Sequence, residues 1–496
     1  MKSIRNHKSL IYGRRNRIKP DTHFRKWFLL LPLLFCIAVI GNLTLAQAKT
    51  TYTTRSTTNT NIQVYYGAEI TSTQMIATEV AAKLWSEFLA DDVTIKLFVT
   101  TTSQMPKGVL GSATGEMLLP QTSYQDFLSK FSVDKKSQND RTAYTNFQKE
   151  ENQDVSELNV MVNDRLVSGI DDINLASANA KALGILSSNN PDYDGHIVLN
   201  KLIDASSGIP LTWSYNFTNN QIPSNTLDFL STVVHEMGHT LGFISGVDNP
   251  NLKLAIKNEK MLGIPITESD VEDSITPLDL YRFSSQSRNN IVPGDRGSPS
   301  IKGIPDLSIG KNSFFTFNRG FSKVEDMSTG EDTTLGGDGN QASHWKQNKN
   351  AIMEPYLEAG KREAIARADL IALDLIGWDL RSEAMSLDQL AAILPTLYNQ
   401  AKATAEDKIA NSSTWILTEP PRLINPITID VNNSNDSINN NDDDDDDDTL
   451  LSVYSQDSAI AEFCNNSQNN NTSQCIRWRT FGFAKWREYY REIGLK

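Results

Sequence analysis

The sequence predicts an α+β fold, on two observations. Apolar residues alternate over 61–66 and over 93–99, which is typical of strands with one buried face, and residues 73–89 between them have apolar residues at helical spacing. A second helical pattern covers 226–241, where apolar residues recur every three or four positions. Strand, helix and strand in this order predict a mixed domain in which helices cover a sheet.

Three further elements are expected between these patterns. The polar region 124–158 is expected to be helical in part, and 175–186 is an alanine-rich helix that Gly184 would end. Residues 194–200 read as a turn into a short strand. We expect this strand at the edge of the sheet, where it could pair with the backbone of a polypeptide substrate.

Residues 1–48 have the pattern of a signal peptide. Nine Lys or Arg residues precede an apolar run over 27–40, and Ala46-Gln47-Ala48 is a small-residue cleavage signal. The run is shorter than the roughly 20 residues that cross a bilayer, so we expect no stable membrane span after cleavage. The protein is therefore expected outside the cytoplasm, as an extracellular, cell-surface or periplasmic protein.

The C-terminal part begins with a low-complexity segment. Residues 431–448 are rich in Asn and end in seven aspartates, which predicts a solvated linker before a short tail over 449–496. The aspartates are candidate ligands of calcium (Ca²⁺), although carboxylates without a fixed turn are poorly organised to bind this ion. In an oxidising compartment Cys464 and Cys475 of the tail are expected to form a disulfide.

The charge balance argues against nucleic-acid binding. The chain has a formal net charge of −13, and its basic residues form no cluster outside the leader. The sequence has no signature of a particular oligomeric state.

The helix over 226–241 contains the string His235-Glu236-Met237-Gly238-His239. Two histidines four residues apart project from one face of a helix, and neutral imidazole is a good Zn²⁺ ligand. Glu236 lies beside them and would accept a proton from a metal-activated water. Asn225 is the expected N-cap of this helix, and Gly242 is expected to end it in a left-handed conformation.

A hydrolytic zinc site usually has three protein ligands, so a third is needed. The candidates are Glu259, Asp248, His196 and His344. Glu259 lies twenty residues after His239, Asp248 is close in sequence, His196 begins the strand over 194–200, and His344 stands about a hundred residues further on.

The region around His344 carries a family resemblance. Asp338-Gly339-Asn340-Gln341-Ala342-Ser343-His344-Trp345 is followed by Ala351-Ile352-Met353-Glu354-Pro355 and by an apolar helix over 369–376. With the zinc-helix motif, this order resembles the metzincins that have a long insertion before the third His, the leishmanolysin-like arrangement of bacterial exported metalloproteases. The resemblance implies that His344 is the third ligand, that Gly242 turns the chain toward it, and that Met353 lies under the metal.

The resemblance also implies a domain plan. A metzincin-like catalytic domain over 49–380, with a twisted mixed sheet, a long active-site helix and a Met-turn subdomain, would contain an insertion at about 246–340, and 381–430 would form a helical extension. The sequence departs from the compact metzincin motif at Ser245, where that motif has its third ligand. The expected activity is that of a secreted zinc endopeptidase with Glu236 as general base; the alternative is a secreted surface or binding protein whose zinc helix is only structural.

Overall fold

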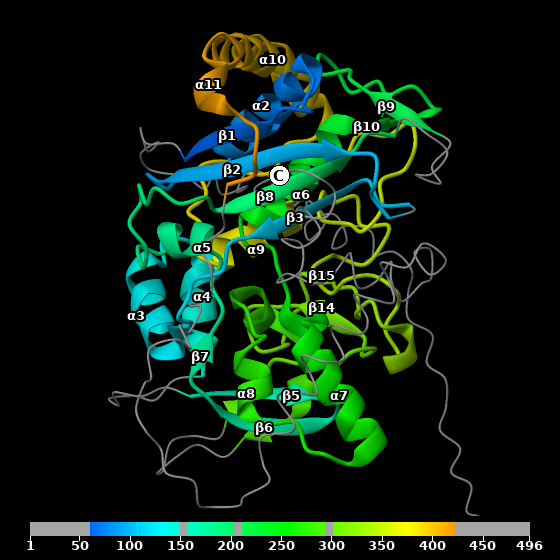
Figure 1. Cartoon of the computed structure of the whole chain (residues 1–496). Coiled ribbons are helices and arrows are strands. Elements are labelled where there is room, and N and C mark those ends of the chain that lie inside the picture. The colour runs from blue at the N-terminus through cyan, green and yellow to red at the C-terminus, as the bar shows by residue number, and fades with distance from the viewer. Residues whose placement is uncertain (1–59, 107, 149–156, 203–210, 293–300, 422–496) are drawn as a thin grey trace, which may run out of the picture. The chain divides into compact units, whose positions relative to one another are not determined.

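The computed structural model describes residues 60–106, 108–148, 157–202, 211–292 and 301–421. A five-stranded mixed sheet forms its centre, and the chain has the α+β composition that the sequence predicts (Figure 1). Across the sheet the strands are β16 (Ile416–Leu417), β1 (Asn61–Gly67), β2 (Thr94–Thr102), β8 (Gly195–Asn200) and β3 (Gly111–Gly115). β3 is antiparallel to β8, and the other neighbours are parallel.

The strands predicted over 61–66 and 93–99 are confirmed as β1 and β2. Val64 of β1 and Leu97 of β2 are partners in the parallel register and are fully buried. The alternation in sequence therefore marks the face of the sheet that the helices cover.

The helix predicted over 73–89 is α2 (Ser72–Ser86), which connects β1 to β2. It begins at a capping box of Thr71 and Gln74. α10 (Leu387–Ala410), from the expected helical extension, packs against α2, and β16 from the same extension pairs with β1 (Figure 1). The extension thus adds both a helix and a strand to the sheet domain.

The strand predicted over 194–200 is β8, but its expected place at the sheet edge is wrong. β8 pairs with β2 on one side and with β3 on the other. The edge strand on this side of the sheet is β3, whose sequence Gly-Ser-Ala-Thr-Gly lacks the large apolar residues that would have indicated a strand.

The helical region predicted after β3 is present in part. α3 (Tyr124–Asp134) and α4 (Gln138–Asn146) lie within 124–158, which ends at β5 (Leu158–Val162), the partner of β6 (Arg165–Ile170). α5 (Ser177–Ala182) is shorter than the expected helix, and Gly184 has the positive φ of 67° that follows a helix end.

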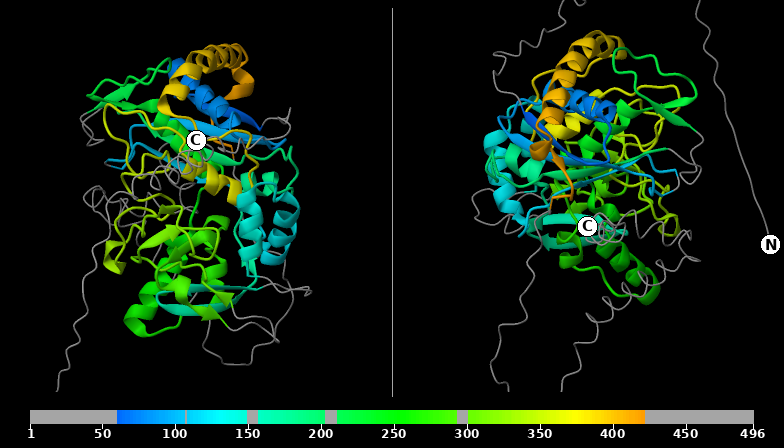
Figure 2. Two further views of the ribbon diagram at one scale, coloured as in Figure 1. Left: turned by 180° about the vertical axis from the view of Figure 1, so that it is seen from behind. Right: turned by 45° about the horizontal axis from the view of Figure 1, so that its top comes forward.

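The expected insertion at about 246–340 forms a second group of elements. α7 (Pro250–Leu262) and α8 (Glu268–Glu272) pack together, and α8 packs on β6. β11 (Arg282–Ser284), β14 (Ser313–Phe315) and β15 (Glu325–Asp326) make a small antiparallel sheet. Figures 1 and 2 show α7 and α8 beside the β5–β6 hairpin, at the end away from α10, with β14 and β15 between them and the main sheet.

Several expectations fall outside the described residues. These are the signal peptide over 1–48, the linker over 431–448, and the tail over 449–496 with its Cys464–Cys475 pair. Among the residues that the structure describes, no helix is long and apolar enough to cross a membrane.

Candidate metal centre

The site is built on α6 (Phe229–Thr240), the helix with the His-Glu-x-x-His string. Its N-cap is Asp228, whose carboxylate accepts the backbone N–H of Ser231 at 3.2 Å; the expected cap, Asn225, is wrong. The reason is that residues 226–228 form strand β10 (Thr226–Asp228), paired with β9 (Thr212–Ser214), so the helix begins later. Gly242 has φ of 101°, as expected for the residue that ends the helix.

The structure brings His235 and His239 of α6 together with His344 of a distant loop. The Nε2 atoms of His235 and His239 are 3.1 Å apart, and the Nε2 atom of His344 is 3.3 Å from each of them. His239 and His344 are 9% and 8% exposed. Three imidazole nitrogens therefore point at one buried place.

Backbone carbonyl groups set the protonation of all three rings. The Nδ1–H of His235 donates to the carbonyl of Ile352 at 2.7 Å. The other two donate in the same way, His239 to Phe243 at 2.8 Å and His344 to Gln341 at 3.1 Å. Because a carbonyl only accepts, each Nδ1 carries the proton and each Nε2 presents a lone pair to the other two rings.

Burial keeps these rings neutral. It lowers the pKa of His235 to about 4 and, with the charge of His235 adding to the effect, that of His239 to about 3; the pKa of His344 is lowered well below its usual value. Three lone pairs at this separation repel one another without a cation between them. The donor set fits a transition metal such as Zn²⁺, because imidazole nitrogen is a preferred ligand of that ion and three ligands leave an open position.

The other third-ligand candidates lie elsewhere. The Glu259 carboxylate pairs with Arg165 at 2.7 Å, and His196 lies in β8 with its ring against Phe98. Asp248 accepts the backbone N–H groups of Glu331 at 2.9 Å and Ala342 at 2.6 Å. Asp248 therefore holds the loop that leads to His344.

Asp194, just before β8, takes part in a buried ion pair. Its carboxylate pairs with Lys181 at 2.6 Å, and both side chains are almost completely buried. It also accepts the hydroxyl of Ser177 at 2.7 Å. These partners tie β8 to α5.

Glu236 lies next to the imidazoles on α6. It is 5% exposed, and burial raises its pKa to about 8. A Cβ atom at Gly111 would lie 2.5 Å from its Oε1 atom, so the absence of a side chain in β3 leaves room for this carboxylate. Glu236 thus occupies the space between the histidines and the edge strand.

Met353 packs under α6 at Gly238, the residue directly before His239. A Cβ atom at Gly238 would lie 2.4 Å from the Met353 Sδ atom, so glycine is what allows this contact. The carboxylate of Asp369, at the start of α9 (Arg367–Leu375), accepts the N–H groups of Ile352 at 3.0 Å and Met353 at 3.3 Å. It also accepts the indole N–H of Trp345 at 2.7 Å, so one buried carboxylate fixes the turn and the segment after His344.

The sequence reasoning missed the roles of Asp248 and Asp369. The signal for Asp369 was an acidic residue in a mostly apolar helix, since a fully buried carboxylate must have hydrogen-bond donors around it.

Ser245, at the position of the third ligand in the compact motif, has another role. Its hydroxyl donates to Asp279 at 2.6 Å, and its N–H donates to the Ser343 hydroxyl at 2.9 Å. Ser343 precedes His344 in sequence. The insertion therefore supplies Asp279 to the turn after α6, and that turn contacts the loop with the third histidine.

A cavity of about 650 Å³ opens on the three histidines. Its walls come from β3 and the residues before it, one side of α6 from Ser231 to His239, the loop at 339–344, and the segment 351–363. No family model, curated protein or solved structure matches this chain. The chemistry of the site is therefore inferred from its own geometry.

Proposed function

We propose that the protein is an exported zinc-dependent endopeptidase of the metzincin type, with His235, His239 and His344 as metal ligands. The observation that carries the proposal is the convergence of three neutral imidazoles, each with its Nε2 lone pair directed at one point beside a buried glutamate. Bound zinc would polarise a substrate carbonyl group and lower the pKa of a water molecule to about 7.

Glu236 is the general base of the proposed reaction. Burial raises the pKa of this carboxyl group, which makes its ionised form a stronger proton acceptor. The charge of a bound zinc ion would favour that ionised form. The same group can therefore take the proton of the attacking water and deliver it to the departing amine. Its position between the histidines and β3 puts it beside a peptide bond that lies along that strand.

The edge strand β3 is the proposed docking element for the polypeptide substrate. It ends the main sheet, and the residues from Val109 to Thr114 line the cavity next to Glu236. An extended peptide can add to such an edge through backbone hydrogen bonds. We therefore assign the pairing with substrate, which the sequence led us to expect of the strand over 194–200, to its neighbour β3.

The alternative, a surface or binding protein with a structural zinc helix, fits the site less well. A structural zinc site is normally closed by a fourth protein ligand. Among the described residues, the metal-binding group at this place consists of the three histidines, and the cavity opens on them. Three imidazole ligands, an adjacent carboxylate and an open position are what a hydrolytic zinc site needs.

The proposal is tested by measuring zinc content and casein cleavage of the purified protein beside its Glu236→Ala variant. We expect one zinc per chain in both proteins and cleavage only by the wild type, because the carboxylate moves protons and does not hold the metal. Cleavage by Glu236→Ala at a comparable rate would refute the mechanism.

A further inference from the structure

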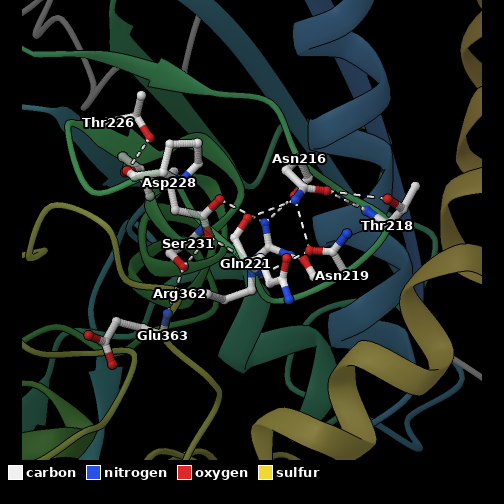
Figure 3. A network of polar contacts seen from close by, with 11 residues as sticks. Asn216, Thr218, Asn219, Gln221, Thr226, Asp228, Ser231, Arg362 and Glu363 are labelled. Atoms are coloured by element: carbon white, nitrogen blue, oxygen red, sulfur yellow. Dashed lines mark hydrogen bonds and ion pairs between the residues drawn. The ribbon is translucent and has the colours of Figure 1, made fainter.

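A fully buried ion pair fixes the chain next to the first turn of α6. Arg362 donates from Nε and Nη2 to the two carboxylate oxygens of Asp228, each at 2.8 Å, and both side chains are at most 1% exposed. Arg362 also donates to the carbonyl groups of Asn216 and Asn219 (Figure 3). Because Asp228 is the N-cap of α6, this network anchors the residues around Arg362 to the helix of the metal site.

The anchored segment places Glu363 on the wall of the cavity. Its N–H donates to the Ser231 hydroxyl at 2.9 Å, and Ser231 precedes His235 by one helical turn. Figure 3 shows the Glu363 carboxylate turned away from the Arg362–Asp228 pair. The carboxylate is half-buried and has no hydrogen bond or ion pair within the part of the chain that the structure describes.

The cavity has an acidic lining. Among the described residues around it are five carboxylates and no Lys or Arg; the carboxylates belong to Glu236, Asp248, Asp273, Glu354 and Glu363. Asp248 and Glu354 accept backbone N–H groups, and Asp273 accepts the amide of Gln121. With Glu236 assigned to proton transfer, Glu363 is the carboxylate that is left for a ligand.

The electrostatics of Glu363 favour a cationic partner. Burial, followed by the charge of Glu354, raises the pKa of Glu363 to about 7. A cation placed next to it would favour the ionised form, and the charge-assisted hydrogen bonds would be stronger than neutral ones. The cavity wall also contains Leu211, Leu227 and Leu357, which can pack against the aliphatic stem of a long basic side chain.

We propose that Glu363 is a specificity-determining residue that selects substrates with a Lys or Arg side chain near the scissile bond. The inference rests on the proposed peptidase function and names its substrate class. The ion pair behind Glu363 is what makes this selection effective, because a carboxylate on a fixed backbone loses little conformational freedom when it binds.

The experiment compares hydrolysis of matched peptides. A neutral peptide is varied at each position in turn to Lys, Met or Glu, the cleavage site is located by mass spectrometry, and kcat/KM is measured for every peptide. At one position we expect Lys to exceed Met by about tenfold to a hundredfold, the range of a charge-assisted hydrogen bond. In Glu363→Gln this Lys-to-Met ratio should fall close to one, and Glu363→Lys should favour the Glu peptide at the same position.

A matched control comes from the same segment. Glu358 carries the same charge five residues earlier, is exposed and does not line the cavity, so Glu358→Gln should keep both the activity and the Lys-to-Met ratio. An equal loss of the ratio in Glu358→Gln would mean that net charge, not Glu363, selects the substrate. A wild type that cleaves Lys and Met peptides equally at every position would overturn the inference while the peptidase function stands.

Binding provides a second measurement that does not depend on turnover. Fluorescence anisotropy with the zinc-loaded Glu236→Ala protein should show tighter binding of the Lys peptide than of the Met peptide, and Glu236→Ala/Glu363→Gln should remove the difference. If no peptide is hydrolysed but this difference is present, the proposed function fails and the assignment of Glu363 as the cation-binding group remains. If the difference is absent, the assignment of Glu363 is refuted.

Discussion

Replacement of His344 by alanine is the decisive test of the metal centre. The variant removes one of three converging Nε2 atoms and leaves His235 and His239 on one helix. Structural zinc sites bind with about 10–16 kcal/mol from four ligands, or roughly 2.5–4 kcal/mol for each ligand. We therefore expect the zinc affinity of His344→Ala to fall by about a hundredfold to a thousandfold.

Two control variants separate the loss of a ligand from the loss of a buried side chain. His196 is 8% exposed, the same fraction as His344, and lies in β8 outside the metal group. Glu259 is the ligand candidate that the structure pairs with Arg165. His196→Ala and Glu259→Ala should both keep their zinc.

The assay is a competition titration with a chromophoric zinc chelator, with circular dichroism to check that each variant is folded. Unchanged zinc affinity in folded His344→Ala would refute the three-histidine centre. Zinc loss in Glu259→Ala with retention in His344→Ala would indicate instead that the two helix histidines work with Glu259.

Three further variants test the support of the site. Gly238→Ala should lower the free energy of unfolding by about 1 kcal/mol, because the clash with Met353 outweighs the gain in helix propensity that alanine usually brings. A variant that is more stable than the wild type in urea unfolding would contradict this clash. Asp369→Ala should destabilise the fold by about 3 kcal/mol or more, since it leaves several buried donors without an acceptor; a change below 1 kcal/mol would show that the carboxylate is dispensable. In the metal-free folded protein the pKa of His239 is lowered to about 3, whereas in the unfolded chain this histidine takes up a proton near pH 6.5. Below pH 6.5 the free energy of unfolding of the wild type should therefore fall relative to that of His239→Gln, by about 1.4 kcal/mol per pH unit. A constant difference between the two proteins from pH 7 to pH 4.5 would count against the neutral histidines.

The sequence by itself determined the local parts of the site. The helix, the one-turn separation of His235 and His239, and the glycine that ends the helix follow from helical periodicity and backbone sterics, which act over a few residues. The buried strands β1 and β2 were equally visible, because alternation in sequence is alternation of the two faces of a sheet.

Only the tertiary structure determined which residues far apart in the sequence lie next to one another in the site. The resemblance named His344, but only the packing of the loop shows its Nε2 atom 3.3 Å from that of His235, 109 residues away. Asp248 has no local pattern that reveals its function, since a carboxylate acquires its role from the donors and charges that surround it after folding. The proposed role of Glu363 likewise depends on the cavity that folding builds around it.

The prediction that the strand over 194–200 lies at the edge of the sheet was wrong for the same physical reason. The alternation of β8 shows that it is a strand and cannot show which strands lie beside it, because strand order depends on contacts between segments far apart in the chain. The glycine-rich β3, with little side-chain signal of its own, lies at the edge beside Glu236, where the absence of a side chain at Gly111 leaves space for that carboxylate.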